Sequence, residues 1–329
     1  MHALKLRPRA PFDFDATARF LRFTEAELVD KFDAGVYARA SHFGDKLLLL
    51  TVSSDAARAR PSLLVSLAPS RSVTRADLTE AEEKVRQTFS VAHDLRRWRA
   101  QVSDDPLMSR LETAHRGLHL PRWATLFEAL TNAILLQQIA TTVAWTFRRR
   151  VVERFGEQLS FGGKKFYAFP RPHALAGATV ESLRALGLSG AKAQSIIEMA
   201  RTIDAGALDT DALARADNEE IIARLSTLRG VGRWTAEWVL MLHFGRTDVC
   251  AAADLFLRGA VVKYYNDGAP MTEREIRAFA ARRWGAWQSY AALYLLAGMR
   301  AGSITLKPER VLLSQPPGAR REREPTNQR

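Results

Sequence analysis

The sequence predicts an α+β region over residues 1–112, followed by a helical region over 113–302 and a polar tail over 303–329. Short apolar runs bounded by Gly, Pro or Ser, which are typical of strands, occur only within about the first 100 residues. After Gly117 such runs stop, and segments with helical spacing follow one another. The last stretch, QPPGARREREPTNQR, is rich in charge and proline, so we expect it to be disordered.

Within the first region we expect two strands and two helices. The runs DKLLLLTVS (45–53) and SLLVSLAPS (62–70) are apolar and bounded by turn-forming residues, which predicts strands. The segments 15–28 and 74–89 have the spacing of helices. Thr74 and Asp77 are candidate caps for the second helix, because either side chain can accept a hydrogen bond from the first turn. This mixture indicates an α+β domain.

Helical spacing continues almost without interruption from Pro121. Residues 121–156 predict one long helix or two abutting helices, and residues 179–206 predict short helices. The segment 217–228 begins with Asp217 as a candidate cap and has acidic residues in its first turn, where the helix dipole favours negative charge. Two late helices are expected in the segments EREIRAFAARRW and QSYAALYLLAGMR. The second region is therefore predicted to be all-α.

The composition points to a polyanionic partner. The 329 residues have a formal net charge of +12 and a pI of about 10.2, which suggests nucleic acid before membrane, although a solvated basic surface would have the same composition. Cys250 is the only cysteine, which excludes a disulfide within the chain and a cysteine cluster for zinc or iron–sulfur. We find neither the apolar core of a signal peptide nor an apolar run of membrane-spanning length, so we expect a cytoplasmic protein.

The stretch LRGVGRWTAEWVLMLHFG, Leu228 to Gly245, predicts a tight turn between two helices. Gly230 and Gly232 permit positive φ and allow another backbone to approach closely. The amide groups at the start of the second helix have no partner within that helix, so together with the helix dipole they form an anion site. In a basic protein the expected anion is a DNA phosphate. The alternative is a corner between helices that needs glycine only for packing.

Several segments together resemble the helix-hairpin-helix (HhH-GPD) DNA glycosylase superfamily. LRGVGRWTA followed by AAADLFLRGAV resembles its hairpin, helix and loop aspartate, NAILLQQIATTVA resembles its glutamine-bearing helix, and RWGAWQSYAALYL resembles its late helix. The start, APFDFDATARFLRF to GVYARAS, resembles the additional α+β domain of the AlkA-like 3-methyladenine DNA glycosylase II branch. The resemblance covers nearly the whole chain except the tail. It implies a helix-hairpin-helix glycosylase core with a cleft over residues 113–302.

The resemblance also implies an enzyme of base excision repair that acts on damaged bases in double-stranded DNA. Superfamily members that also cut the DNA backbone carry a lysine nucleophile at the position of Trp234, and an indole cannot attack the sugar. We therefore expect a monofunctional glycosylase that hydrolyses the N-glycosidic bond of alkylated purines of the 3-methyladenine and 7-methylguanine type. Water is the expected nucleophile and an abasic site the product, after the target base has left the duplex stack.

The base pocket is expected to be aromatic. An alkylated purine carries positive charge on its ring, and an indole attracts it through stacking and a cation–π interaction. Trp234 and Trp238 are one helical turn apart and share a face. The resemblance implies that Phe20 and Gln138 contribute to the same pocket, although a glutamine in an apolar helix can instead satisfy a local hydrogen bond. Leu296 stands where the branch often has another pocket aromatic, so the substrate range can differ from that of the branch.

Asp254 is the candidate catalytic residue. In CAAADLFLRGAVVKYY it precedes an apolar helix, so it is also a candidate N-cap, and both roles favour the ionised carboxylate. Loss of an alkylated base passes through a transition state that resembles an oxocarbenium ion, which a carboxylate stabilises while it orients or deprotonates water. The superfamily's catalytic aspartate falls at this position. The second acid that often precedes it is Ala253 here, and Asp248 is the alternative candidate.

Further DNA contacts follow from the same resemblance. Leu120 stands where the family can place an apolar wedge in the gap left by the everted base, although packing at the helix entry is an equal alternative. Thr235 is expected to cap the helix start or to donate to phosphate beside Gly230 and Gly232. No catalytic metal or organic cofactor is implied, but the superfamily allows a monovalent cation at the hairpin carbonyls. We expect a monomer.

Other functions would use the same features. One is a glycosylase for deaminated or oxidised bases, and another is a non-catalytic helix-hairpin-helix DNA-binding protein. Asp254 argues against the second, because a carboxylate beside a polyanion repels phosphate and has no use in a protein that only binds. A bifunctional glycosylase-lyase is disfavoured by Trp234.

Overall fold

The computed structural model describes residues 3–22, 24, 26–55, 61–69 and 73–306. The first part of the chain forms a five-stranded antiparallel sheet with the strand order β1-β5-β4-β3-β2. Its strands are β1 Ala3–Leu6, β2 Lys31–Asp33, β3 Val36–Phe43, β4 Lys46–Ser54 and β5 Leu63–Ala68. The two strands predicted over 45–53 and 62–70 are β4 and β5, and the other three have too few consecutive apolar residues to be recognised by that pattern.

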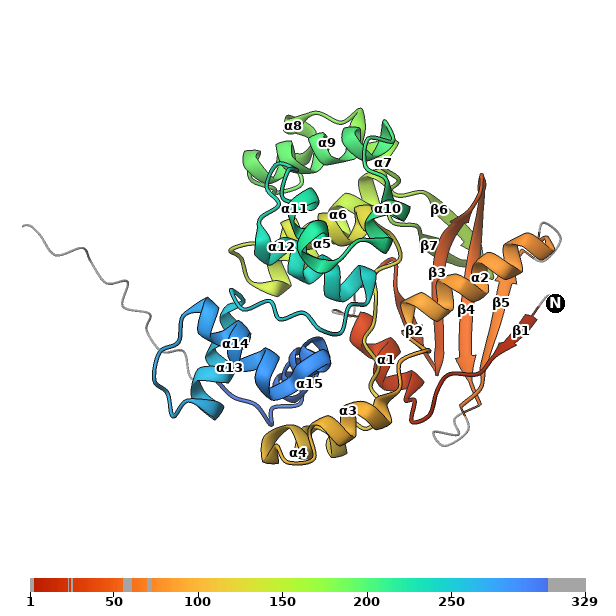
Figure 1. Cartoon of the computed structure of the whole chain (residues 1–329). Coiled ribbons are helices and arrows are strands. Elements are labelled where there is room, and N and C mark those ends of the chain that lie inside the picture. The colour runs from red at the N-terminus through yellow and green to blue at the C-terminus, as the bar shows by residue number, and fades with distance from the viewer. Residues whose placement is uncertain (1–2, 23, 25, 56–60, 70–72, 307–329) are drawn as a thin grey trace, which may run out of the picture.

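Two helices, α1 (Phe14–Leu21) and α2 (Arg75–Thr88), lie with one face of this sheet in a shared core. Alternate residues of β4, Leu48, Leu50 and Val52, point into that core, as the period of a strand requires. Helix α1 ends earlier than the predicted range. Thr74 caps α2 and forms a capping box with Asp77, which confirms the predicted cap. Figure 1 shows α2 lying along the sheet.

The rest of the chain is mainly helical, as predicted. The predicted helix over 121–156 is divided into α5 and α6 by four residues. The helices are α3 Leu95–Gln101, α4 Pro106–Ala114, α5 Leu126–Leu136, α6 Thr141–Phe155, α7 Pro172–Ala176, α8 Val180–Arg184, α9 Gly190–Asp204, α10 Thr210–Arg215, α11 Asn218–Leu225, α12 Arg233–Val239, the π-helical turn η2 Leu240–Phe244, α13 Leu255–Tyr265, α14 Glu273–Trp284, the 3-10 turn η3 Gly285–Trp287 and α15 Gln288–Arg300.

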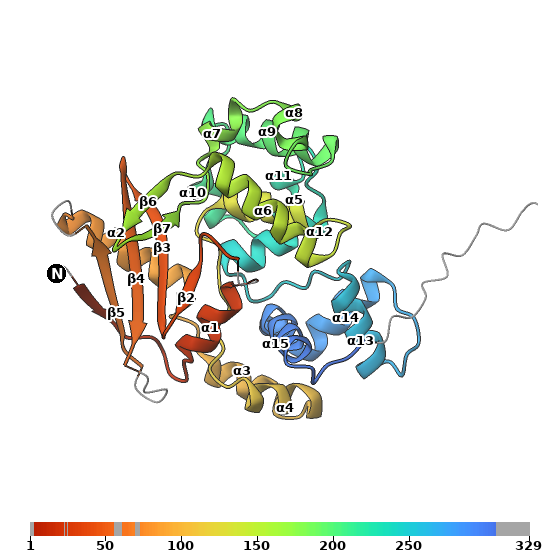
Figure 2. The ribbon, with the colours of Figure 1, turned by 180° about the vertical axis from the view of Figure 1, so that it is seen from behind.

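These helices form two groups. Figures 1 and 2 show α5 to α12 above and α3, α4 and α13 to α15 below, with the segment from η2 to α13 running between the groups. The segment is held from below, because the Ser289 hydroxyl at the start of α15 donates to the carbonyls of Arg246 and Val249 at 2.8 and 2.9 Å. It ends at Asp254, so the boundary between the two groups determines where the candidate catalytic residue lies.

One hairpin interrupts the helical region and was not predicted. Strands β6 (Gln158–Phe161) and β7 (Lys164–Tyr167) join through Gly162 and Gly163, both with positive φ, which is the geometry that a two-residue hairpin turn requires. Phe166 of this hairpin packs with Ala40 and Leu49 of the sheet, on the face opposite the helices. The hairpin therefore covers part of the sheet and connects the helical region to it.

Buried charges also join the two regions. Arg39 of β3 pairs with Asp30 at 2.7 Å and with Glu128 of α5, and Arg148 of α6 pairs with Glu128 at 2.8 Å and with Glu27. All five side chains are buried. We call these five residues the ionic junction. It attaches α5 and α6 to the N-terminal domain on both sides of the loop that connects the two helices.

The first residues of the predicted tail are folded. Ile304 is buried, Leu306 lies against Gly259, and the carbonyl of Thr305 accepts a hydrogen bond from Lys263 at 2.5 Å. Residues 303–306 are therefore part of the fold, and the remainder of the predicted disordered tail, 307–329, lies outside the described residues. Among the residues that the structure describes, no helix has the length and apolar character needed to cross a membrane.

Candidate active site

The predicted hairpin is present, and its two glycines have different roles. Helix α11 ends at Leu225 and α12 begins at Arg233. Gly230 has a φ of 77°, and a Cβ atom there would lie 2.5 Å from Ser195 Oγ on α9, so this position requires glycine. Gly232 has an ordinary φ of −98°, is exposed, and has nothing within 4 Å of an added Cβ. The space in front of Gly232 is open to whatever approaches the hairpin.

The start of α12 has the properties of an anion site. Gly232 is its N-cap, and no side chain caps the first turn. Helix α12 passes directly into η2, so the helical segment extends to Phe244. First-turn amides and the positive end of the helix dipole favour an anion at this place.

The Thr235 side chain is turned into the protein, which does not favour the predicted donation to phosphate. It is 1% exposed, and its hydroxyl accepts a hydrogen bond from Gln137 Nε2 at 2.9 Å. The same Nε2 donates to the carbonyl of Gly230 at 2.8 Å. Gln137, which follows α5, therefore links the end of that helix to the hairpin through two hydrogen bonds.

Asp254 is the N-cap of α13, as predicted. Its Oδ1 atom accepts hydrogen bonds from the amides of Phe256 at 3.0 Å and Leu257 at 3.1 Å. Burial raises the pKa of the Asp254 carboxyl above its usual value, and the Leu257 amide and the indole N–H groups of Trp234 and Trp238 act in the opposite direction. The carboxylate is thus partly removed from water yet surrounded by N–H donors.

The structure brings Trp234 and Trp238 to Asp254. Both indoles lie on α12, with ring centroids 6.4 Å apart and ring planes at 69°. Both are half-buried, so each keeps exposed surface. Their N–H groups lie close enough to Asp254 to lower the pKa of its carboxyl. Asp248, the alternative acid, is exposed, and its carbonyl accepts a hydrogen bond from Gln288. These positions favour Asp254 over Asp248.

Phe20 is not an open stacking surface. The ring is 8% exposed, and the guanidinium carbon of Arg300 lies 3.8 Å from its centroid. Arg300 also donates to the Phe20 backbone carbonyl at 3.1 Å, so the guanidinium contacts both the ring and the main chain of this residue. The sequence pattern did not indicate this arginine, because it lies 280 residues from Phe20.

The exposure of two further predicted site residues differs from what their expected roles need or suggest. Leu120 has 0% exposure, and its amide donates to the Tyr290 hydroxyl, so its side chain cannot enter a duplex without unfolding the core. Gln138 lies outside a helix, on the exposed loop between α5 and α6, with a φ of 57°. It therefore lies on the surface of the molecule. Its positive φ is uncommon for a residue with a side chain.

Lys192 supports this exposed loop. Its Nζ atom donates to the carbonyls of Leu135 and Gln137, each at 2.8 Å, at the end of α5. Together with the Gln137 side chain, it fixes the backbone that precedes Gln138. The loop is thus exposed at its tip and attached at its base.

Leu255 is a feature that the sequence analysis missed. It follows Asp254 directly, and it is 79% exposed, the highest value among the exposed large apolar side chains of the described residues. Its place in the first turn of α13 directs it outward while the neighbouring carboxylate caps the helix. Leu296, at the position of the missing pocket aromatic, is half-buried.

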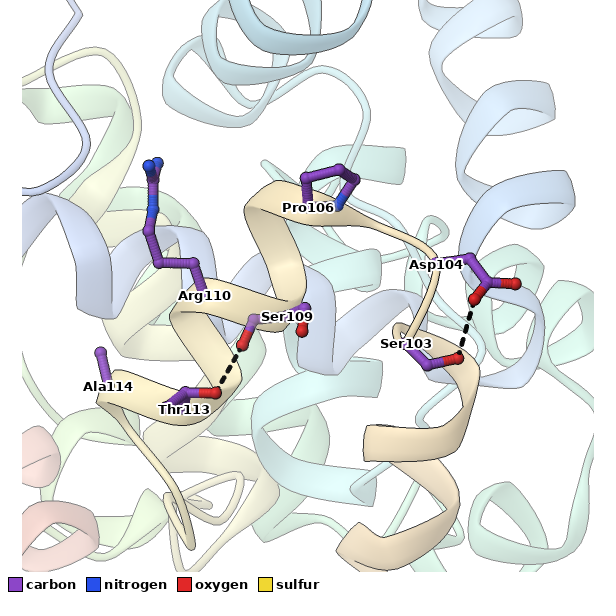
Figure 3. Close-up of a pocket in the computed structure, with 7 residues that line it drawn as sticks. All are labelled: Ser103, Asp104, Pro106, Ser109, Arg110, Thr113 and Ala114. Carbon is purple, nitrogen blue, oxygen red and sulfur yellow. Dashed lines mark hydrogen bonds between the residues drawn. The ribbon is translucent and has the colours of Figure 1, made fainter.

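A surface hollow of about 620 Å³ lies elsewhere. It is lined by residues from the end of α3 to the end of α4, including Ser103, Arg110 and Thr113 (Figure 3). Figure 3 shows Arg110 pointing away from the hydroxyls of Ser103 and Thr113. None of the predicted site residues lines this hollow, so its size alone does not make it the candidate site.

Family models agree with this geometry. The AlkA N-terminal domain matches residues 3–125, and the model of the HhH-GPD superfamily base excision DNA repair protein matches residues 131–286. The chain belongs to the HhH-GPD superfamily. Together the two matches confirm the predicted family and the order of an α+β domain followed by a helix-hairpin-helix core. The protein is a DNA glycosylase of base excision repair.

Individual relatives cover nearly the whole chain. A DNA-3-methyladenine glycosylase of Bacillus subtilis is 27% identical over 86% of this chain and 93% of its own length. DNA-3-methyladenine glycosylase 2 of Escherichia coli is 29% identical over 90% of this chain and 96% of its own length. The solved structure of a 3-methyladenine DNA glycosylase from Archaeoglobus fulgidus has a TM-score of 0.80 and 26% identity, and covers 92% of this chain and 100% of its own.

Proposed function

We propose that this protein is a monofunctional glycosylase that removes alkylated purines of the 3-methyladenine and 7-methylguanine type from double-stranded DNA. The observation that supports the proposal most is the grouping of Asp254 with the indoles of Trp234 and Trp238. The names of the relatives described above support the same lesion class. The product is an abasic site, and water is the nucleophile.

The indoles bind the base. An everted alkylated purine is flat and positively charged, and a half-exposed indole offers it both a stacking surface and a cation–π interaction. Stacking on an aromatic side chain is worth about 1–3 kcal/mol per base, which offsets part of the free energy needed to unstack it. Because Trp234 and Trp238 lie at Asp254, a base on either ring places its sugar near the carboxylate.

The carboxylate performs the chemistry. As the bond between the sugar and the base breaks, positive charge develops on the sugar, and the ionised Asp254 stabilises it. The two amides on Oδ1 keep the carboxylate in one orientation. Its other oxygen, Oδ2, orients water or accepts its proton.

Absence of lyase activity is part of the proposal. A β-elimination pathway of the superfamily type needs an amine that forms a Schiff base with the sugar, and Trp234 occupies that position. Lys192 is the lysine attached to the loop beside the hairpin, and its ammonium group already donates to two backbone carbonyls. The residues described at this site therefore offer a carboxylate and indoles, and the amine of Lys192 is already engaged.

DNA is held by two exposed elements in this proposal. The amides at the start of α12 bind a phosphate, and the open space at Gly232 allows the DNA backbone to come close. The loop that carries Gln138 enters the gap left by the everted base, a role that the buried Leu120 cannot perform. The loop suits this role because it is exposed at its tip and fixed at its base. Both elements act without reading the sequence of the DNA.

A monovalent cation fits the hairpin. The carbonyl of Leu228 accepts one hydrogen bond from the Val231 amide, and that of Gly230 accepts one from Gln137, so each oxygen keeps a second lone pair. Neutral carbonyl oxygens are hard ligands that suit such an ion. Leu228 and Gly230 would hold the cation, and it would supply positive charge beside the phosphate.

The test uses methylated duplex DNA with the wild-type protein and the Asp254→Asn variant. Wild-type protein should release free methylated purine, and strand breaks should appear only after alkali treatment. Asp254→Asn should bind the same DNA without releasing base. Strand cleavage without alkali would contradict the monofunctional assignment, and binding without release by the wild type would reduce the protein to a DNA-binding module on this substrate.

A further inference from the structure

Leu255 is far more exposed than the other large apolar side chains on the surface of the described residues. It is 79% exposed, whereas the others in this class lie between 39% and 43%. Single apolar residues on a protein surface are common, so exposure alone assigns no role. The position of this residue does, because it follows Asp254 in the chain.

Backbone geometry places this side chain beside the candidate catalytic carboxylate. Consecutive Cα atoms are about 3.8 Å apart. Leu255 is the first residue of α13, the helix that Asp254 caps through Oδ1. Side chains of a helix tilt toward its N-terminus, so that of Leu255 leans toward the end at which the carboxylate lies. A group that reaches the carboxylate therefore also reaches Leu255.

The first turn of α13 also differs from those of two other helices in the helical region. Helices α11 and α14 carry acidic residues in their first turns, where the helix dipole favours negative charge. The first turn of α13 carries none. Leu255 adds no charge to the helix end and buries little surface against the protein, so the stability of α13 does not explain a leucine at this position.

We propose that Leu255 packs against the deoxyribose of the everted nucleotide. This inference rests on the proposed glycosylase function, in which Asp254 stabilises positive charge on the sugar carbon that loses the base. The carboxylate then lies close to the sugar, and the adjoining side chain meets the same nucleotide. Deoxyribose lacks the 2′-hydroxyl and exposes carbon-bound hydrogens there, so it suits an apolar partner. The contact removes Leu255 from water, which is favourable.

This contact recognises an everted nucleotide, whichever base it carried. In an intact duplex the sugar keeps its place in the backbone, and it reaches Asp254 and Leu255 only when the nucleotide turns out of the stack. Leu255 therefore stabilises the everted state independently of the indoles, which bind the base. Because burial of apolar surface involves no ions, the contribution of Leu255 is insensitive to salt, in contrast to phosphate contacts at the hairpin.

The test compares two duplexes that differ at one nucleotide. One is undamaged, and the other carries tetrahydrofuran, a sugar analogue without a base. Leu255→Ala should weaken binding of the tetrahydrofuran duplex by about tenfold, which corresponds to about 1.4 kcal/mol, and binding of the undamaged duplex by less than about twofold. The loss on the tetrahydrofuran duplex should be the same at low and at high salt. Fluorescence anisotropy measures each affinity.

Two further variants serve as controls. Leu255→Met keeps an apolar side chain of similar volume and should bind the tetrahydrofuran duplex as the wild type does. Leu64→Ala removes an exposed leucine from β5 of the N-terminal domain and should leave both affinities unchanged. Leu255→Ala should keep the Tm of the wild type, because the side chain is exposed and alanine is favourable in a helix.

The outcomes separate the inference from the function on which it rests. Equal losses on both duplexes would show a contact with DNA in general, and no loss on either would show no contact, so each result overturns the inference. A lower Tm of Leu255→Ala without the selective loss overturns it too, because the protein itself then covers the side chain. If Asp254→Asn still releases base at the wild-type rate, the proposed function fails, whatever the binding of the Leu255 variants.

Discussion

Two polar clusters of this protein differ in how completely their groups are paired. In the ionic junction, each of the three carboxylates contacts at least one arginine. Burial would raise the pKa of Asp30, but the charges of Arg39 and Arg148 lower it below its usual value. At the candidate active site, no arginine or lysine forms an ion pair with Asp254 in the described residues, and burial raises its pKa.

The comparison shows what each cluster is for. A buried carboxylate that is paired with arginine has little left to offer a ligand, so the junction stabilises one arrangement of two domains. A half-enclosed carboxylate that is surrounded by N–H donors and has no cation paired with it can still receive a group that arrives from outside. The following experiments, ordered by expected effect, test whether this distinction holds.

The largest effect should come from Asp254→Asn. The amide keeps an oxygen that can cap α13, because asparagine and aspartate are comparable caps, but it cannot stabilise positive charge or accept a proton. Base release should fall by about 10²–10⁴-fold, the range of general acid–base contributions. Single-turnover assays on methylated DNA measure this effect, and wild-type rates in the variant would contradict the role of Asp254.

Arg148→Met tests the other cluster. It leaves Glu27 and Glu128 buried without their common partner, and removing one member of a buried pair costs about 3–5 kcal/mol. Urea unfolding should show a loss of this size. The control is Arg149→Met on the same helix, because Arg149 pairs with Glu153 at 2.7 Å on the surface and should contribute less than about 0.5 kcal/mol. Equal losses for both variants would show that the junction does not stabilise the fold.

The two hairpin glycines should separate folding from DNA binding. Gly230→Ala forces a side chain into positive φ and against Ser195, so it should lower the free energy of unfolding by about 1–3 kcal/mol. Gly232→Ala meets no atom of the protein and should leave stability nearly unchanged while it weakens DNA binding. Fluorescence anisotropy with duplex DNA and thermal unfolding measure the two quantities. Normal DNA affinity in Gly232→Ala would remove the hairpin from the binding surface.

The exposed loop provides a smaller effect. Gln138→Ala should slow base release several-fold without changing stability, because the side chain is exposed and enters the protein's function only when DNA is bound. Val143→Ala is the control, since Val143 is 42% exposed on the adjacent helix α6. Equal rates for the two variants would exclude the loop tip from the role of wedge.

The smallest effect concerns stability and pH. Because the pKa of Asp254 is raised in the folded protein, the folded state binds this proton more tightly than the unfolded chain does. The stability that results is present below the unfolded pKa and is lost as pH rises through the folded pKa. At neutral pH, Asp254→Asn should therefore have a Tm equal to or above that of the wild type, and the difference should diminish in acid. A clearly lower Tm at neutral pH would contradict the raised pKa.

The same shift affects the rate. Base release should increase as Asp254 ionises, with an acid limb above the range of an ordinary aspartate. Trp234→Phe removes an N–H that lowers the pKa, so its acid limb should move to higher pH. The pKa of Cys250 also responds to Asp254, but burial raises that pKa to about 12, so the thiol does not titrate in the same pH range. A pH–rate profile of single-turnover excision measures the acid limb of the wild type and that of Trp234→Phe.

Some of the candidate site could be predicted because its causes are local. Asp254 caps the helix that begins one residue later, and Trp234 and Trp238 share a face because they are one turn apart. The hairpin follows from two glycines in a short segment. Each of these features depends on backbone geometry within about one helical turn, where residue type and spacing decide the outcome.

Other parts could not be predicted because their causes are distant in the sequence. Leu120 and Gln138 both belong to segments that resemble the family, but the pattern of a segment does not say which side chain the rest of the fold covers. Arg300 lies on Phe20 only because the last helix packs against the first. Strand β3 carries the charged residue Arg39 at a buried position, so its sequence does not show the alternation of apolar and polar residues that is typical of a strand. The position is explained only by Asp30 and Glu128, which pair with Arg39 in the folded protein.

The sequence by itself determined the order of an α+β domain and a helix-hairpin-helix core, the helix caps, the glycine turn and the identity of the candidate acid. The tertiary structure decided which of the proposed contacts are buried, which loop reaches the surface, and that the indole N–H groups of Trp234 and Trp238 lie beside Asp254. The physical reason is that hydrogen bonds within a turn are set by neighbours in the chain, whereas burial is set by elements that meet only after folding.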